Sequence, residues 1–153
     1  MVRLTDVSEA MSAHLLKTPC PEFETTPWTP GPPLEERRIA IISTAALQRH
    51  SDPLLTRGAT DYRIIPADTP AGDLIMAHNS SNFDRTGYQQ DLNICFPLER
   101  LKELAREGVI GSIADYHYSV LGSTAPEKLD VAGRTLAGLL KKDGVDTVLL
   151  VPV

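Results

Sequence analysis

The chain has 153 residues, of which 42% are hydrophobic and 23% charged, and its formal net charge is −5. This length fits one domain with a real hydrophobic core. The acidic balance argues against nucleic acid as a partner, and no apolar run is long enough to cross a membrane. Acidic residues interrupt the first segment, which therefore lacks the apolar region of a signal peptide, and we expect a cytoplasmic protein.

Residues 1–36 differ in composition from the rest of the chain. Residues 1–16 predict a short amphipathic helix. Six prolines between Pro19 and Pro33 then preclude a continuous helix and disfavour a central strand. We expect an ordered Pro-rich arm here, with a disordered linker as the alternative. The predicted organisation is an N-terminal region over 1–36 and an α/β domain over 37–153.

Apolar runs and helical periodicity alternate from residue 37 onward. Ile39–Ile42 is a continuous apolar run, which is typical of a parallel strand buried on both faces. Pro97 can open a helix that Gly108 ends, and Thr124 and Glu127 have the spacing of a capping box. The predicted strands are 37–44, 61–65, 75–76 and 147–153, and the predicted helices are 97–107 and 124–143.

This alternation predicts a Rossmann-like α/β fold, with a largely parallel sheet flanked by helices and the Pro-rich arm before it. Ser43 and Thr44 end the first strand, on the side of the sheet where ligands usually bind. We therefore name both as candidate substrate-binding residues.

A polar, aperiodic stretch over residues 78–96 is predicted to be a long loop, which is unusual in a compact domain unless it is functional or disordered. His78 could act as a general acid or a substrate ligand, or could pin the loop. Asp84 and Asp91 could bind a cationic amine or orient His78, although such residues often serve as turn or cap groups.

His117 lies between two tyrosines and could act near a reaction centre or pack as a hydrogen-bonded core histidine. Cys20 and Cys95 have no CxxC neighbour, so a disulfide framework is not supported. The histidines and aspartates lack paired ligand spacing, and we predict no metal site.

The order and spacing of several short stretches carry a further signal. These stretches are the Trp28 segment, Arg38–Thr44, Tyr62–Pro66, His78–Arg85, Asp91–Asn93, Phe96–Leu104, Gly108–Ile113, His117–Ser119, Gly122 and Asp143–Val153. In this order they resemble the selenoprotein B family of the glycine, sarcosine, betaine and D-proline reductases. One departure is Ala45–Gln48, where members of that family commonly have a glycine pair and a histidine, so the substrate of this chain could differ.

The resemblance implies a reductase in which a selenolate, or a thiolate in some relatives, attacks a small amine or amino-acid-type substrate and cleaves a C–N bond. A partner thiol then regenerates the selenium through a selenide–sulfide bond. The implied partners are a thiol redox protein or other reductase subunits. No cofactor is implied beyond the selenocysteine or cysteine itself.

In the resembling family, the redox residue directly follows the final strand. On this reading we expect a chain cut short after Val153, through a misread UGA codon or a deliberate truncation, and catalytically inert by itself. His78 and His117 would then be accessory groups. The alternative is a non-catalytic small-molecule-binding or subunit-interaction domain that ends naturally at Val153. We also expect a homo-oligomer that covers the apolar last strand.

Overall fold

The computed structural model describes residues 3–17, 22, 24–79 and 85–153. The chain divides into two compact units, Met1–Pro30 and Gly31–Val153. In the first unit, a 3-10 helix (Leu4–Asp6) precedes helix α1 (Glu9–Lys17), which buries none of its residues. The predicted N-terminal helix is therefore shorter and more exposed than expected. No helix in the described part of the chain is both long and apolar enough to span a membrane.

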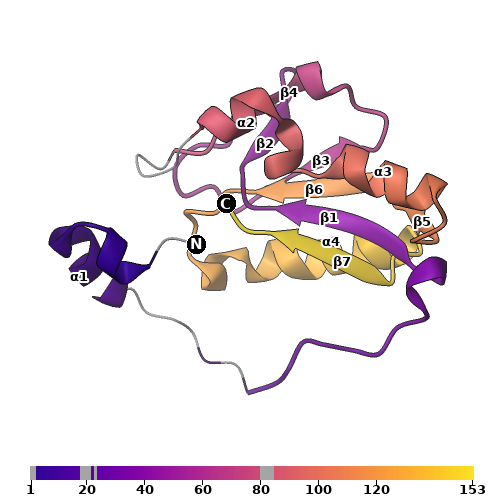
Figure 1. The fold of residues 1–153 in the computed structure, drawn as a ribbon, viewed down its shortest axis with the longest axis horizontal. Helices are drawn as coiled ribbons and strands as arrows, with labels where there is room; N and C mark the ends of the chain where they lie inside the picture. The colour runs from indigo at the N-terminus through magenta and orange to yellow at the C-terminus, as the bar shows by residue number, and fades with distance from the viewer. Residues whose placement is uncertain (1–2, 18–21, 23, 80–84) are drawn as a thin grey trace. The chain divides into compact units, whose positions relative to one another are not determined.

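The second unit is an α/β structure (Figure 1). Its strands are β1 (Arg38–Ser43), β2 (Leu47–Arg49), β3 (Tyr62–Pro66), β4 (Leu74–Met76), β5 (Ser112–Ile113), β6 (Tyr116–Val120) and β7 (Thr147–Val151). Its α-helices are α2 (Thr86–Gln90), α3 (Leu98–Arg106) and α4 (Asp130–Lys142). Short 3-10 helices cover Leu34–Glu36, Ala71–Asp73, Leu92–Ile94 and Pro126–Leu129.

Strand β1 is the centre of the main sheet. It pairs in parallel with β7 on one side, and with β5 and then β6 on the other. Strand β3 pairs with β6 in the antiparallel sense, while β2 and β4 form a separate antiparallel pair. The prediction of a largely parallel sheet is therefore wrong in part: the sheet is mixed. Strand β6 was not predicted from the sequence, because four of the five residues in Tyr116–Val120 have polar or amphipathic side chains in place of an apolar run.

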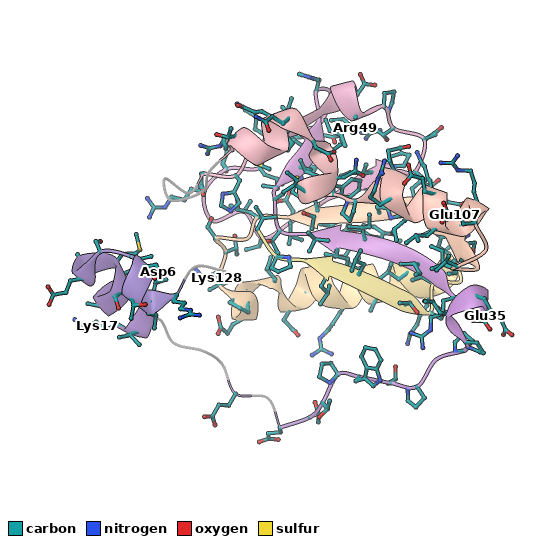
Figure 2. The ribbon with its side chains drawn as sticks, viewed as in Figure 1. Asp6, Lys17, Glu35, Arg49, Glu107 and Lys128 are labelled. Atoms are coloured by element: carbon teal, nitrogen blue, oxygen red, sulfur yellow. The ribbon has the colours of Figure 1, made fainter. Side chains whose placement is uncertain are left out.

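Alternate residues of β1 face opposite layers of the unit. Ile39 and Ile41 pack in a core with Leu98 and Leu101 of α3, whereas Ala40 packs with residues of α4. In Figure 2 side chains fill the space between the helices and the sheet, and the labelled Arg49 lies at the periphery. This arrangement is the period-two alternation that a strand buried on both faces requires.

Two predictions about the connecting segments are also corrected. Residues 78–96 are not one irregular loop, because α2 and a 3-10 helix lie within their described part. The capping box does not form: the Thr124 hydroxyl donates to the carbonyl of Ala59 at 2.7 Å, and the helix it was expected to cap begins later. Gly108 and Gly144 do end their helices, each with a positive φ, of 72° and 69° respectively.

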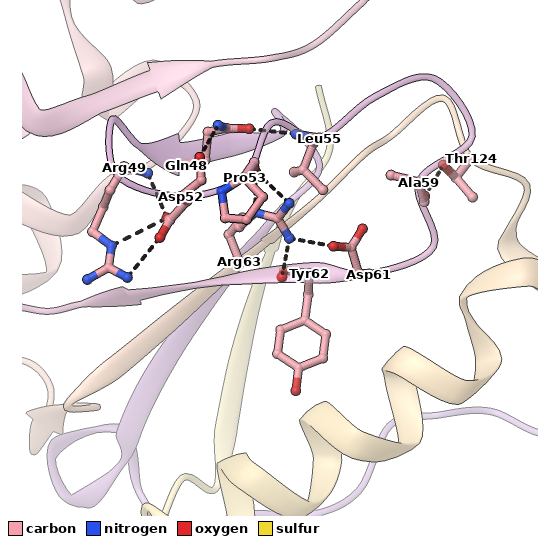
Figure 3. A network of polar contacts seen from close by, with 10 residues as sticks. All are labelled: Gln48, Arg49, Asp52, Pro53, Leu55, Ala59, Asp61, Tyr62, Arg63 and Thr124. Atoms are coloured by element: carbon pink, nitrogen blue, oxygen red, sulfur yellow. Dashed lines mark hydrogen bonds and ion pairs between the residues drawn. The ribbon is translucent and has the colours of Figure 1, made fainter.

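Polar contacts fix the long connection between β2 and β3 (Figure 3). The guanidinium of Arg63 donates to the carbonyl of Pro53 and pairs with Asp61. Arg49 and Asp52 form an ion pair at 2.9 Å. The buried Gln48 accepts the amide hydrogen of Leu55 at 2.8 Å. Because these side chains satisfy backbone groups of the connection, it is ordered without regular secondary structure.

Candidate functional site

The carboxyl ends of β1, β6 and β7 meet at one edge of the sheet, where the arrowheads in Figure 1 converge. We call this region the carboxyl edge and define it as residues 43–46, 77–79, 120–124 and 151–153. Backbone hydrogen bonds join its segments: Thr44 N–H donates to Val151, Gly122 N–H to Thr44 and Ala77 N–H to Ala46, at 2.9–3.0 Å. The predicted residues Ser43, Thr44 and His78 therefore lie in one connected region.

Ser43 and Thr44 have different surroundings at this edge. Ser43 is fully buried, and its hydroxyl donates to the carbonyl of Cys95 at 2.8 Å. Thr44 is half-buried, and its hydroxyl oxygen accepts the amide hydrogen of Val153 at 2.8 Å while lying 3.3 Å from the carbonyl oxygen of the same residue. Thr44 thus clamps the backbone just after β7, whereas Ser43 holds the sheet to the segment before α3.

The segment after Thr44 keeps an unusual backbone conformation. Ala46 has φ of 53° and is fully buried, although this left-handed region favours glycine. Gln48 is fully buried as well and bonds the backbone of Leu55. Within Ala45–Gln48, the stretch in which the sequence departs from the pattern it resembles, Ala46 and Gln48 are therefore both part of the buried local structure.

Gly122 makes the closest backbone approach at the carboxyl edge. A Cβ atom placed there would lie 2.9 Å from both the Cβ and the carbonyl oxygen of Thr44. Only glycine allows β6 and β1 to approach so closely at this point. No role for Gly122 was predicted from the sequence, although a glycine next to a strand end can signal such a contact.

His78 follows β4 and is 6% exposed. Burial lowers the pKa of His78 below its ordinary value, and the nearby Arg85 guanidinium lowers it further. The guanidinium of Arg85 also donates to the His78 carbonyl. The imidazole is consequently neutral at pH 7 and can accept a proton or a hydrogen bond.

His117 fills a break in the sheet. Strand β1 advances from Ile39 to Ile42 while its partner advances from Ile113 to Tyr118, so the partner side contains two extra residues. The amide hydrogen of Ile41 is donated to Nδ1 of the fully buried His117 at 3.0 Å. Burial lowers the pKa of His117 to about 4. This environment is that of a packed core histidine.

Nε2 of His117 has no hydrogen-bond partner among the described residues. Since Nδ1 accepts, Nε2 carries the hydrogen of the neutral ring. The ring meets Phe96 edge-on, with centroids 5.9 Å apart.

Asp91 lies in a different environment from the carboxyl edge. It lines a cavity of about 260 Å³ together with Gln90, Asn93, Phe96 and Glu99, and none of Ser43, Thr44 or His78 lines that cavity. Hydrogen bonds from the amide and side chain of Asn93 lower the pKa of Asp91. Asp91 therefore acts as the N-cap of the 3-10 helix at Leu92–Ile94. Asp84 lies outside the described residues.

Cys95 is the cysteine within the described part of the chain, and it is 1% exposed. Burial raises the pKa of its thiol to about 11, so the thiolate needed for nucleophilic attack is scarce at pH 7. Cys20 lies outside the described residues. Among the described residues, no group of three or more His, Cys, Asp and Glu side chains could hold a metal ion.

Comparison with known proteins gives a consistent result. The family model for glycine/sarcosine/betaine reductase selenoprotein B matches residues 18–153. The D-proline reductase subunit gamma of Acetoanaerobium sticklandii is 29% identical over 127 residues, which are 80% of this chain and 52% of the relative. The sarcosine reductase complex component B subunit beta of Peptoclostridium acidaminophilum is 30% identical over 142 residues, 86% of this chain and 32% of the relative.

A third relative, the glycine reductase complex component B subunit gamma of Symbiobacterium thermophilum, is 30% identical over 144 residues, again 86% of this chain and 32% of the relative. The chain thus spans about half of the first relative and about a third of the other two. No solved structure matches significantly. Because the family model covers most of its length, the chain belongs to the glycine/sarcosine/betaine reductase selenoprotein B family.

Proposed function

We propose that this chain is a component B-like subunit of a reductase that cleaves a small amine or amino-acid-type substrate. The family match over residues 18–153 carries the proposal. Relatives are named as subunits of D-proline, sarcosine and glycine reductases, which supports a place beside other reductase subunits. A thiol redox protein as a further partner is part of the same proposal. Strand β1 pairs in parallel with β5, β6 and β7, as strands do in Rossmann-like folds. In such folds ligands bind beyond the carboxyl ends of the parallel strands, which supports a reaction site at the carboxyl edge.

In this proposal the reacting selenium or sulfur atom works beside the carboxyl edge. The ionised chalcogen attacks the substrate carbon and displaces the amine, and a partner dithiol then releases the reduced product and the ionised chalcogen as it is oxidised to a disulfide. Thr44 fixes the backbone at Val153 through its hydroxyl group. His78 is neutral at pH 7 and serves as a proton acceptor or as a ligand for the substrate ammonium group.

The chain by itself is proposed to be inert. Cys95 is buried and its thiol has a raised pKa, while its carbonyl oxygen accepts a hydrogen bond from the Ser43 hydroxyl. These features are those of a structural residue. His117 likewise supports the sheet, which leaves His78 as the accessory group of choice.

A second candidate function is a non-catalytic module that binds small molecules or other subunits. The complete burial of Ser43 and His117 favours it, since neither side chain is open to a ligand. The two candidates differ in one observable, which is whether His78 affects turnover in an assembled reductase.

The test is a reconstitution with the remaining subunits of a family reductase. Cleavage of glycine, sarcosine, betaine and D-proline would be followed by mass spectrometry, with a dithiol as reductant. We expect His78→Gln to lower kcat by about 10²-fold, as loss of a general acid or base does. The exposed His50 provides the matched control, and His50→Gln should retain full turnover. Equal rates for the two variants, or no turnover in any assembly, would favour the non-catalytic module.

A further inference from the structure

Arg85 places a positive charge beside His78 at the carboxyl edge. Its carbonyl accepts the amide hydrogen of Gln89 at 3.0 Å, in the first turn of α2, and its guanidinium donates to the His78 carbonyl. The positive charge also acts on the His78 imidazole. The residues that define the carboxyl edge include no Asp, Glu, Lys or Arg side chain. Arg85 therefore brings a cation to a region whose own side chains carry no formal charge at pH 7.

Hydrogen bonds also hold the segment around His78 against the neighbouring strand ends. The amide of Ala77 donates to the carbonyl of Ala46 at 2.9 Å. On the other side of His78, the Asn79 side-chain oxygen accepts a hydrogen bond from the Ser123 hydroxyl at 3.0 Å. The carbonyl that binds the guanidinium thus lies between two anchored residues. This anchoring gives the guanidinium a defined attachment at the carboxyl edge.

The guanidinium of Arg85 keeps hydrogen-bond donors for another group. An arginine side chain presents several N–H donors in a planar fork, and the His78 carbonyl accepts from one nitrogen of Arg85. No carboxylate among the described residues forms an ion pair with this guanidinium. Arg38, Arg49 and Arg63, in contrast, each pair with an aspartate of the fold. The remaining donors of Arg85 are consequently suited to an anionic ligand.

The compounds in the names of the relatives share one anionic group. Glycine, sarcosine, D-proline and betaine differ at nitrogen, and the quaternary nitrogen of betaine has no N–H to donate. Each of them has a carboxylate, which is ionised at pH 7. Guanidinium groups bind carboxylates through two parallel hydrogen bonds. Because the net charge of this chain is −5, a local cation is needed to attract such a ligand.

We propose that Arg85 binds the carboxylate of the substrate and thereby selects amino-acid-type substrates over simple amines. This inference rests on the proposed function, and it decides between the two substrate classes named there. In an α-amino acid a single carbon atom joins the carboxylate to the nitrogen, so the groups that bind them must be neighbours. Arg85 and His78 are such neighbours. The neutral imidazole then faces the nitrogen of the substrate while the guanidinium holds its carboxylate.

Matched ligands with and without a carboxylate test the role of Arg85. The ¹⁵N-labelled chain would be titrated with glycine and methylamine, sarcosine and dimethylamine, betaine and tetramethylammonium, and D-proline and pyrrolidine, and followed by nuclear magnetic resonance. We expect at least one amino acid to bind the carboxyl edge at least about tenfold more tightly than its counterpart. Arg85→Gln should raise the dissociation constant of that amino acid by about ten- to a hundredfold and leave that of the counterpart unchanged.

Two further variants separate carboxylate binding from a structural role. Arg85→Lys should give an intermediate dissociation constant, because lysine keeps the charge but not the planar fork. Arg106→Gln is the matched control, since Arg106 is an exposed arginine at the end of α3, outside the carboxyl edge. It should leave both dissociation constants unchanged. In the wild-type chain, the Nε–H signal of Arg85 should shift with the amino acid but not with its counterpart.

The outcomes distinguish this inference from the proposed function. If an amino acid binds the carboxyl edge as tightly after Arg85→Gln as before it, Arg85 does not bind the carboxylate, although the substrate site stands. An equal loss of affinity for both members of a pair would likewise overturn the inference, because it would show a structural role. If no ligand shifts the amides of the carboxyl edge in any chain, the proposed substrate site fails and the role of Arg85 fails with it.

Discussion

Buried polar residues carry much of the architecture at the residue scale. His117 replaces a strand partner for the Ile41 amide at the point where β1 changes from β5 to β6. Ser119 donates to the Ser43 carbonyl and accepts the Leu47 amide hydrogen at 2.8 Å. Each of these side chains forms a hydrogen bond with a backbone group that the sheet leaves without a partner. A buried amide without a partner would otherwise cost about 1–3 kcal/mol.

The His117 environment leads to a pH dependence of stability. Its pKa is about 4 in the folded chain against 6.5 for an unperturbed histidine, because burial disfavours the charged ring. The unfolded chain therefore binds a proton between pH 6.5 and pH 4 that the folded chain does not. Stability from this group is complete above pH 6.5 and is lost as the pH falls toward 4, by about 3 kcal/mol in all.

Urea unfolding at a series of pH values measures this effect. His117→Asn removes the titrating ring, so its unfolding free energy should fall less than that of the wild type between pH 6.5 and pH 4. The same substitution at the exposed His50 controls for loss of a histidine. If the two variants have the same pH dependence, His117 does not carry the acid sensitivity.

At the scale of helices and strands, two glycines have opposite packing environments. Gly122 lies against Thr44, whereas Gly138 of α4 would place a new Cβ in open space. These two glycines make a matched pair, because the same substitution adds the same atom in opposite environments.

We expect Gly122→Ala to lower the free energy of unfolding by about 2 kcal/mol, since Thr44 must shift to admit the methyl group. Gly138→Ala should raise it by about 0.5–1 kcal/mol, because alanine is the better helix former. Thermal and urea unfolding of both variants provide the comparison. A neutral or stabilising Gly122→Ala would contradict the close approach of β6 to β1.

The sequence predicted those elements whose signals are local. The apolar run Ile39–Ile42 and the glycine after each long helix correctly placed β1, α3 and most of α4. Strand β6 was missed because its buried residues include His117 and Ser119, whose burial depends on distant backbone partners. Thr124 was assigned to a cap, but a carbonyl 65 residues away competes for its hydroxyl group.

The candidate site was predictable only in part for the same reason. The position of Ser43 and Thr44 follows from the end of a parallel strand, and both lie at the carboxyl edge. The separation of Asp91 from that edge depends on how residues 85–99 fold back beside Thr69–Leu74, which no local pattern records. The depth of Ser43, which takes its hydroxyl out of reach of a ligand, is likewise a tertiary property.

At the largest scale, within the unit Gly31–Val153, helices cover both faces of the main sheet, whose carboxyl edge joins β1, β6 and β7 (Figure 1). The chain spans between a third and a half of its curated relatives. Within that portion, the carboxyl edge contains the half-buried hydroxyl group of Thr44 and the neutral imidazole of His78. The backbone of Gly122 packs closely against Thr44 at the same edge. We propose that a reductase substrate binds at this edge.

Nuclear magnetic resonance mapping of substrate binding tests this claim most directly. The ¹⁵N-labelled chain would be titrated in turn with glycine, sarcosine, betaine and D-proline. We expect amide shifts from at least one of these to cluster at Thr44, His78 and Gly122, and to disappear in His78→Gln but not in His50→Gln. Shifts that cluster instead around Asp91 and Glu99, or no saturable shift with any of the four, would contradict the account.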